Sequence, residues 1–186
     1  STQDLVNAVK DSGAKEALIL PNDSNIFMAA DQAVEIADVP VKVVRTRTIQ
    51  QGLTALVLGY NPEGTLDDNA EAMTAALGDV KSGAVTTSVR DTTLNGLEIH
   101  AGDAIGLFDG EIVVAVPDAD IHQAAVELLG KMIDDDSELV TVYYGQEATE
   151  DDANKLEEAG LVLDEDLEFE IHDGGQPLYP ILMSVE

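Results

Sequence analysis

Two clusters of polar residues each follow a short apolar run within the first fifty residues. Asn22–Asn25 comes after the run Ala17–Leu20 and Pro21, and Arg45–Thr48 comes after the run Val41–Val44. Amide and hydroxyl side chains at the start of a helix, where backbone N–H groups are unsatisfied, can help to bind a carboxylate or a phosphate. We therefore expect an anion-binding edge that consists of Asn22, Ser24, Asn25, Arg45, Thr46 and Thr48. The alternative is that the first cluster only caps a helix.

The segment between the two clusters must bring them together. Ile26, Ala29, Ala33 and Ala37 recur at helical spacing, and Pro40 ends this pattern. Strand, helix and strand in this order form a βαβ unit, whose two strands are parallel neighbours. The carboxyl ends of parallel strands lie at the same edge of a sheet, where ligands bind in such folds. The two polar clusters should therefore meet at that edge.

A further candidate stretch lies near the end of the sequence, at His172–Gln176. Its two glycines would let a ligand or another backbone segment approach closely. The candidate binding residues here are Gly174, Gly175 and Gln176. A plain turn explains the same residues equally well.

No arrangement of residues in the sequence indicates catalysis. The three histidines, His100, His122 and His172, fall in different predicted elements and lack the spacing of a zinc helix or a known catalytic motif. The sequence contains neither a phosphate loop nor a dinucleotide fingerprint. The acidic run Asp134–Glu138 could offer oxygen ligands to Mg²⁺ or Ca²⁺, but it lacks the glycine and the alternating spacing of an EF-hand loop. A solvated helix end is the better interpretation, so we expect no catalytic residue, metal or cofactor in this chain.

The charge of the chain restricts its partners. The 186 residues carry 37 Asp and Glu against 9 Lys and Arg, a net charge of -28, and aromatic residues make up 4%. Such a surface repels nucleic acid and anionic membranes. A third of the positive charge lies within six residues, at Lys42, Arg45 and Arg47. An anion would be tolerated beside this group of cations. We expect no membrane span, because no apolar run approaches 18 residues, and a cytoplasmic location, because the sequence has no cysteine and no recognisable leader.

The periodicity of apolar residues predicts an α/β protein. Helices are expected over 3–12, 25–38, 53–58, 66–77, 118–133 and 150–159, the third of them short and buried and the last ended by Gly160. Strands are expected over 17–20, 41–45, 84–90, 92–94, 97–99, 104–108, 111–116, 139–144, 167–171 and 178–185. Asn95-Gly96 and Asp109-Gly110 between apolar runs are strong signals for hairpins.

These elements suggest three parts. We expect a parallel-sheet βαβ lobe over 1–80 with helices on both faces, an antiparallel hairpin segment over 81–117, and a second αβ lobe over 118–186. The helical pattern begins almost at residue 1, with Ser1 or Thr2 as its cap. We therefore expect the chain to be a domain of a longer protein.

Several segments together resemble the C-terminal domain found in catalytic subunits of fatty-acid kinases, which are dihydroxyacetone-kinase-like proteins. The matching segments run in order through essentially the whole chain: LPNDSNIFMAADQA (20–33), VRTRTIQQGLTAL (44–56), KSGAVTTSVRDT (81–92) with its continuation GLEIHAGDAIGL, KMIDDDSELVTVYYG (131–145) and HDGGQPLYPILMSVE (172–186).

The resemblance implies a fold related to the DegV-type fatty-acid-binding proteins. It also implies that Mg-ATP is held by a separate kinase domain of the same polypeptide, and that the phosphoryl group goes to a fatty acid carried by a DegV-type partner for phospholipid synthesis. In DegV proteins a Ser-Gly-Thr sequence at the first βα turn helps to bind the fatty-acid carboxylate. The corresponding turn keeps Ser24 but has Asn25 and Ile26 in place of glycine and threonine.

Our leading hypothesis is a non-catalytic module of a bacterial fatty-acid kinase. It would dock the DegV-type partner, or serve as its scaffold, through Asn22–Asn25 and Arg45–Thr48. The remaining domains of its own polypeptide are further expected partners. The alternative is a binding domain of DegV type for a fatty-acid carboxylate or a phosphate, around Ser24, Thr46 and Thr48. A free-standing kinase or phosphatase is the least favoured interpretation, and self-association as a homodimer is left open.

Overall fold

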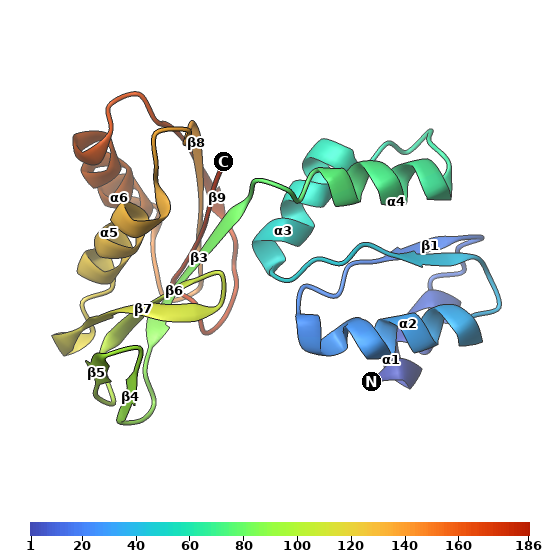
Figure 1. The fold of residues 1–186 in the computed structure, drawn as a ribbon, viewed down its shortest axis with the longest axis horizontal. Helices are drawn as coiled ribbons and strands as arrows, with labels where there is room; N and C mark the ends of the chain where they lie inside the picture. The colour runs from blue at the N-terminus through green and yellow to red at the C-terminus, as the bar shows by residue number, and fades with distance from the viewer. The chain divides into compact units, whose positions relative to one another are not determined.

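The computed structural model describes residues 1–186, which form two compact units, Ser1–Val80 and Lys81–Glu186 (Figure 1). Each unit is described by itself. None of the helices has both the length and the apolar character that a membrane crossing requires.

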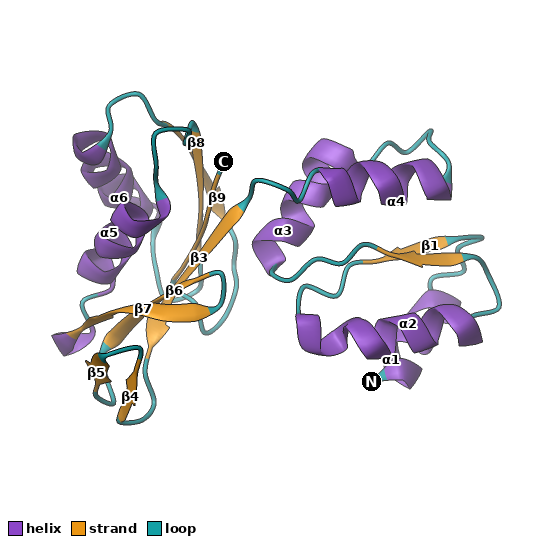
Figure 2. Ribbon diagram, viewed as in Figure 1, coloured by secondary structure: helices purple, strands orange, loops and turns teal.

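The first unit contains one short parallel sheet between helices (Figure 2). Strand β1 pairs in parallel with β2, with Ala17 opposite Val41 and Ile19 opposite Val43. The elements are α1 (Thr2–Asp11), β1 (Ala17–Ile19), the 3₁₀ turn η1 (Ser24–Ile26), α2 (Phe27–Ile36), β2 (Val41–Val43), α3 (Ile49–Thr54), the π-helical turn η2 (Ala55–Gly59) and α4 (Leu66–Ala75).

Alternate residues of β1 enter the two cores of this unit, because successive side chains of a strand point to opposite faces. Ile19 packs with Ala30 and Ala33 of α2 and with the apolar side of α1. Leu18 packs on the other face, in the cluster around Met73 of α4. The expected parallel pair with helices on both faces is therefore present, although the sheet has only two strands.

The helix expected at 53–58 starts earlier and is less buried than the sequence suggests. Thr48 is its N-cap, so Gln50 and Gln51 lie inside the helix. Leu56, Val57 and Leu58 are exposed. The expectation of a short buried helix is wrong, since an apolar run does not reveal which of its residues other elements will cover.

The second unit is a mixed sheet of six strands in the order β7-β6-β3-β10-β8-β9. All neighbours are antiparallel except β8 and β9, which are parallel. The elements are β3 (Lys81–Thr87), β4 (Thr92–Leu94), β5 (Leu97–Ile99), β6 (Ala104–Phe108), β7 (Glu111–Val116), the 3₁₀ turn η3 (Pro117–Ala119), α5 (Ile121–Met132), β8 (Leu139–Tyr144), α6 (Glu150–Leu163), β9 (Glu168–Asp173) and β10 (Ile181–Val185).

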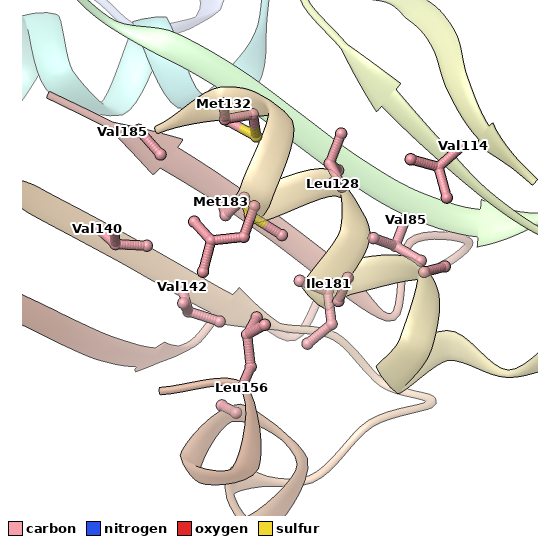
Figure 3. Packing of buried hydrophobic residues seen from close by; sticks show 14 of the residues in the cluster. Val85, Val114, Leu128, Met132, Val140, Val142, Leu156, Ile181, Met183 and Val185 are labelled. Carbon is pink, nitrogen blue, oxygen red and sulfur yellow. The ribbon is translucent and has the colours of Figure 1, made fainter. Parts of the chain in front are cut away.

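The core of this unit lies between the sheet and the pair α5 and α6, which cover the same face (Figures 2 and 3). Leu128 and Met132 of α5 and Leu156 of α6 are almost completely buried there. They pack against side chains from the strands, among them Val85, Val114, Val140, Val142, Ile181, Met183 and Val185.

The expected separation of 81–117 from 118–186 is wrong. Strand β3 pairs with β6 on one side and with β10, the last strand of the chain, on the other, so both segments belong to one sheet. The two predicted hairpin pairs do form, β4 with β5 and β6 with β7, and only the first of them lies outside the six-stranded sheet.

Two helix boundaries also differ from expectation. Helix α5 begins after Asp120, which accepts a bond from the N–H of Gln123, and not at 118. Helix α6 continues through Gly160 to Leu163. Gly160 does not end the helix; instead, it provides space, because a Cβ there would lie 2.4 Å from Phe169 Cζ.

Candidate functional site

The carboxyl ends of β1 and β2 meet, and a hydrogen bond joins them. The backbone N–H of Asn22 donates to Thr46 Oγ1 at 2.9 Å, and Thr46 is completely buried. Asn22 has a φ of 59°, a left-handed conformation that asparagine tolerates better than most residues. The structure therefore brings Asn22 and Thr46 together at the ends of the two strands.

The side chain of Asn22 is held against the first turns of α3. A Cβ on Gly52 would lie 2.3 Å from Asn22 Oδ1, so only glycine allows this approach. The same Oδ1 atom is buried and has no hydrogen-bond partner. An unpaired buried acceptor calls for a donor, and it does not favour a carboxylate or phosphate at this point.

Thr48 serves as the cap of α3. Its hydroxyl accepts a bond from the N–H of Gln51 at 3.1 Å, and the side-chain oxygen of Gln51 accepts one from the N–H of Arg47 at 2.7 Å. Gln50, one residue earlier, is buried. Neither glutamine was among the residues expected at this edge. The pattern Thr-x-x-Gln is a capping-box signature, which could have revealed the helix start and the role of Gln51.

The residues Asp23–Asn25 form a small turn at the surface. Asp23 Oδ1 accepts a bond from the N–H of Asn25 at 2.8 Å and caps η1, whereas α2 begins without a side-chain cap. Ser24 and Asn25 are exposed. Ser24 therefore lies at the exposed rim of the edge region that contains Thr46 and Thr48.

The positive charges at this edge are largely paired. Both carboxylate oxygens of Asp31 accept from Arg45 Nη2, at 2.9 and 2.7 Å, and Lys42 lies 3.0 Å from Asp67. The guanidinium groups of Arg45 and Arg47 lie 5.1 and 5.4 Å from the centre of the Phe27 ring, a cation–π arrangement. Arg47 has no carboxylate within ion-pair distance, which leaves it as the arginine here best able to meet an acidic partner group.

The second predicted group, Gly174–Gln176, belongs to the other unit and forms a closed turn. The amide of Gln176 donates to the carbonyl oxygens of Tyr143 and Tyr179, both at 3.0 Å. Gly175 has a φ of 63°, and a Cβ on Gly174 would collide with the Gln176 side chain. These contacts tie the loop before β10 to the end of β8, which is a structural role for all three residues.

Beside this turn, His172 stacks on Tyr143 with ring centres 5.5 Å apart. Burial, together with the carboxylates of Glu170 and Glu186, raises the pKa of Tyr143 above its ordinary value. The hydroxyl therefore stays protonated at neutral pH and can act only as a neutral donor or acceptor. His100 follows β5 and His122 lies in α5, and no three histidine or acidic side chains converge in a way that could hold a metal ion.

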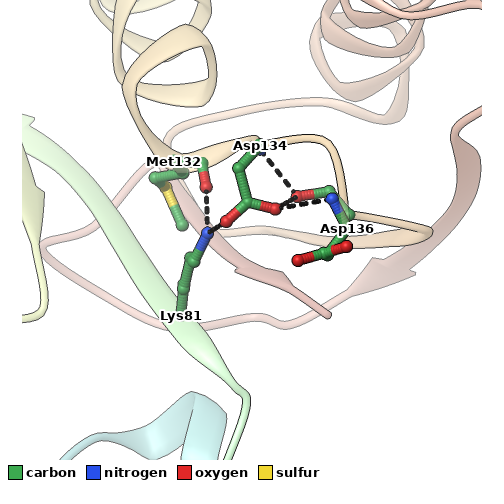
Figure 4. A network of polar contacts seen from close by, with 5 residues as sticks. Lys81, Met132, Asp134 and Asp136 are labelled. Atoms are coloured by element: carbon green, nitrogen blue, oxygen red, sulfur yellow. Dashed lines mark hydrogen bonds and ion pairs between the residues drawn. The ribbon is translucent and has the colours of Figure 1, made fainter.

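The acidic run after α5 is a helix end fixed by a lysine (Figure 4). Lys81 donates to the carbonyl oxygen of Met132 at 3.0 Å and to the carboxylate of Asp134. This bond is the main reason why the pKa of Asp134 lies below its ordinary value. Asp134 also accepts from the N–H of Asp136 at 2.9 Å, so its oxygens have protein partners.

The comparisons with known proteins agree on the family. The whole chain, residues 1–186, matches the FakA-like C-terminal family of fatty acid kinase proteins. It is 43% identical over 186 residues to protein YloV of Bacillus subtilis and 41% identical to protein SH1689 of Staphylococcus haemolyticus, with 100% of this chain covered in both. The chain spans about a third of the length of these relatives, 33% in each case.

The fold is similar to that of several solved structures. One is the DegV family protein Cg2579 from Corynebacterium glutamicum, with a TM-score of 0.64 and 17% identity over 100% of this chain and 80% of that one. Another is the fatty acid kinase (Fak) B3 protein of Streptococcus pneumoniae loaded with linoleic acid, with a TM-score of 0.60 and 15% identity over 100% and 76%. These likenesses show a mixed α/β fold similar to DegV proteins, and the chain itself belongs to the FakA-like C-terminal family of fatty acid kinase proteins.

Proposed function

We propose that this chain is a non-catalytic module of a fatty acid kinase that docks the DegV-type protein carrying the fatty acid. The observation that supports this most strongly is the match of the whole chain to the fatty acid kinase family, together with a fold similar to a Fak B3 protein. The parent enzyme would phosphorylate the carried fatty acid for phospholipid synthesis, in the cytoplasm, with Mg-ATP bound by its remaining domains. The absence of a glycine-rich phosphate loop after β1, where Pro21 and Asn22 follow instead, supports the placing of Mg-ATP in those other domains.

The docking surface in this proposal is the strand-end edge, defined as Asn22–Asn25 together with Arg45–Thr48. Ser24, Asn25, Arg45 and Arg47 are exposed there. The hydrogen bond from Asn22 to Thr46 and the helix cap at Thr48 fix the backbone that carries these side chains. A preformed surface of this kind loses little conformational entropy when a partner binds. Arg47 would meet a carboxylate of the partner.

The DegV-type alternative, direct binding of a fatty-acid carboxylate, has weaker support. The hydroxyl oxygens of Thr46 and Thr48 already accept bonds from backbone N–H groups. The buried oxygen of Asn22 is itself an acceptor and would repel a carboxylate. A carboxylate would therefore have to rely on Ser24 and the arginines at the exposed rim.

Binding of the DegV-type partner to the chain, measured by calorimetry, tests this proposal. Arg47→Glu places a negative charge at the proposed edge and should weaken binding by about tenfold or more, because like charges across an interface are strongly unfavourable. Lys131→Glu makes the same charge change at an exposed site on α5 and should leave the affinity unchanged. Equal affinities for the two variants would contradict the proposed surface.

Turnover of the full kinase polypeptide gives the second test. Removal of residues 1–186 should reduce phosphoryl transfer to the carried fatty acid while leaving binding of Mg-ATP intact. Unchanged turnover together with unchanged affinity for the partner would refute a docking role.

A further inference from the structure

A group of large apolar side chains lies exposed at the far end of α3. Leu56, Val57, Leu58 and Tyr60 are 47%, 78%, 64% and 45% exposed, and we call these four residues the η2 patch. Exposed apolar residues that are contiguous usually mark an interaction surface, and π-helical turns are frequent at functional sites. Gly59 holds the turn in place by packing on the α4 backbone, since a Cβ there would lie 2.5 Å from Met73 Cα.

A pocket opens beside the η2 patch. Its volume is about 270 Å³, and its walls come from β1, the η2 turn and α4. Apolar side chains and polar groups both line the pocket: the apolar ones include Leu18, Leu20, Leu56, Tyr60, Leu66 and Met73, whereas Asn69 is polar and Glu16 is the charged residue among the lining side chains. An apolar cavity of roughly 150 Å³ can hold benzene, so this pocket has room for one leucine or phenylalanine side chain.

Strand β1 has a free edge next to this pocket. Its sheet contains only β1 and β2. Ala17 donates to the carbonyl of Pro40, and Ile19 accepts from the N–H of Val44, so the polar groups of Ala17 and Ile19 face β2. Because these groups alternate along a strand, the N–H and C=O of Leu18 face the outer edge. An extended peptide can add to such an edge and place alternate side chains in adjacent pockets.

Charge indicates which peptide would fit. Glu16 lines the pocket, and Glu63 lies between two other lining residues, Pro62 and Gly64. The chain as a whole carries a net charge of -28, so a second copy would bring carboxylates against carboxylates. A segment with Lys or Arg beside its apolar residue would instead be complementary.

We propose that the pocket, the η2 patch and the edge of β1 together bind an extended segment of a partner protein. One large apolar side chain of that segment enters the pocket, and flanking Lys or Arg side chains meet Glu16 and Glu63. This surface is distinct from the strand-end edge, and the proposal does not depend on the docking role given to that edge.

NMR titration of the 186-residue chain with a defined peptide tests this proposal. The probe is acetyl-Lys-Val-Leu-Val-Lys-amide, and its control carries Glu in place of both Lys residues. The probe should shift the amide signals of Leu18, Leu20 and Tyr60 at about 1 mM, the weak end of specific binding. The glutamate peptide should leave them in place. No shifts with the probe, or equal shifts with both peptides, would overturn the proposal.

Variants locate the binding surface. Leu56→Asp and, separately, Val57→Asp should weaken binding of the probe by about tenfold or more, as expected for contacts at the centre of an interface. Val162→Asp is the matched control, since Val162 is 87% exposed in the other unit, and it should bind the probe like the unchanged chain. The amide spectra of the variants show directly whether they remain folded.

Two outcomes separate this surface from the alternatives. Sedimentation that shows a dimer of the unchanged chain, lost in Leu56→Asp, would identify a second copy as the occupant and overturn the proposal. Arg47→Glu should leave binding of the probe unchanged, so a failure at the η2 patch and a failure at the strand-end edge are distinguishable.

Discussion

Replacement of Gly59 by alanine should strongly destabilise the first unit. The added methyl carbon would lie 2.5 Å from Cα and 2.8 Å from N of Met73. Non-bonded carbon atoms prefer about 3.5–4.0 Å, so α4 would have to move by about 1 Å. Met73 is completely buried with Val44 and Ala55, and this cluster would lose contacts.

The expected loss of stability follows from the rigidity of the α4 backbone at Met73, which the new methyl group would meet. Overpacking costs about 1–3 kcal/mol, and a helix backbone cannot rotate away as a side chain can. We therefore expect a loss of about 2 kcal/mol or more, roughly a 30-fold rise in the unfolding equilibrium constant. Urea titration followed by amide signals of each unit separately is the suitable assay, because two units need not unfold in one step. Val44 reports on the first unit and Val142 on the second.

Gly78→Ala is the matched control in the same unit. The nearest atom to a Cβ at Gly78 is the carbonyl oxygen of Ala75 at 3.7 Å, an ordinary contact. This variant should stay within about 0.5 kcal/mol of the unchanged chain. If the two alanine variants unfold at the same urea concentration, the close packing of η2 on α4 is refuted.

Three further variants test other contacts by urea titration. Lys81→Met removes the main cause of the lowered pKa of Asp134. A carboxyl group whose pKa is lower in the folded state stabilises the fold at pH values above its unfolded pKa, near 3.8. The variant should therefore have a lower free energy of unfolding than the unchanged chain at pH 7, and this difference should shrink as the pH falls through that region. A deficit that grows in acid would contradict this. Thr48→Ala removes the N-cap of α3 and should lower the free energy of unfolding by about 1 kcal/mol, whereas Thr48→Ser keeps a capping hydroxyl and should retain most of that stability. Equal urea midpoints for the two variants would refute the cap. In Gly160→Ala the added methyl group would collide with the Phe169 ring, so the free energy of unfolding should fall by roughly 1 kcal/mol or more, despite the better helix propensity of alanine. A stabilised variant would show that the ring can move aside.

The sequence predicts well those features that depend on neighbouring residues. The hairpins at Asn95-Gly96 and Asp109-Gly110 form where expected, because the turn residues adopt positive φ and the strands on either side pair directly. The parallel pair of β1 and β2 follows from the βαβ pattern in the same way. The contact between Asn22 and Thr46 is a consequence of that pairing.

Features that depend on distant residues could not be predicted from local pattern. The position of β10 between β3 and β8 joins segments from opposite ends of the second unit, and it removes the expected boundary at 117. Gly160 has the residue type of a helix end, but its role depends on Phe169 of a neighbouring strand. The exposure of Leu56–Leu58 likewise depends on which face of η2 the other elements leave uncovered.

The candidate site likewise has features that local sequence predicts and features that depend on distant residues. The edge of the sheet could be located from the order of strand, helix and strand. The pairing of Arg45 with Asp31 and the brace formed by Gln176 depend on side-chain positions that only the structure gives. The brace gives the loop Gly174–Gln176 a structural role, while its predicted role in binding stays a prediction. The ion pair of Arg45 with Asp31 leaves Arg47 as the better candidate for partner contact.

Hydrogen exchange of the chain with and without the proposed partner, a DegV-type protein that carries a fatty acid, tests the proposed docking role most directly. A docking role predicts slower exchange in Asn22–Asn25 and Arg45–Gln51 when the partner is added, and no slowing of these amides when Arg47→Glu is used in place of the unchanged chain. Slower exchange confined to other segments, or no change anywhere at partner concentrations that support phosphoryl transfer, would contradict it.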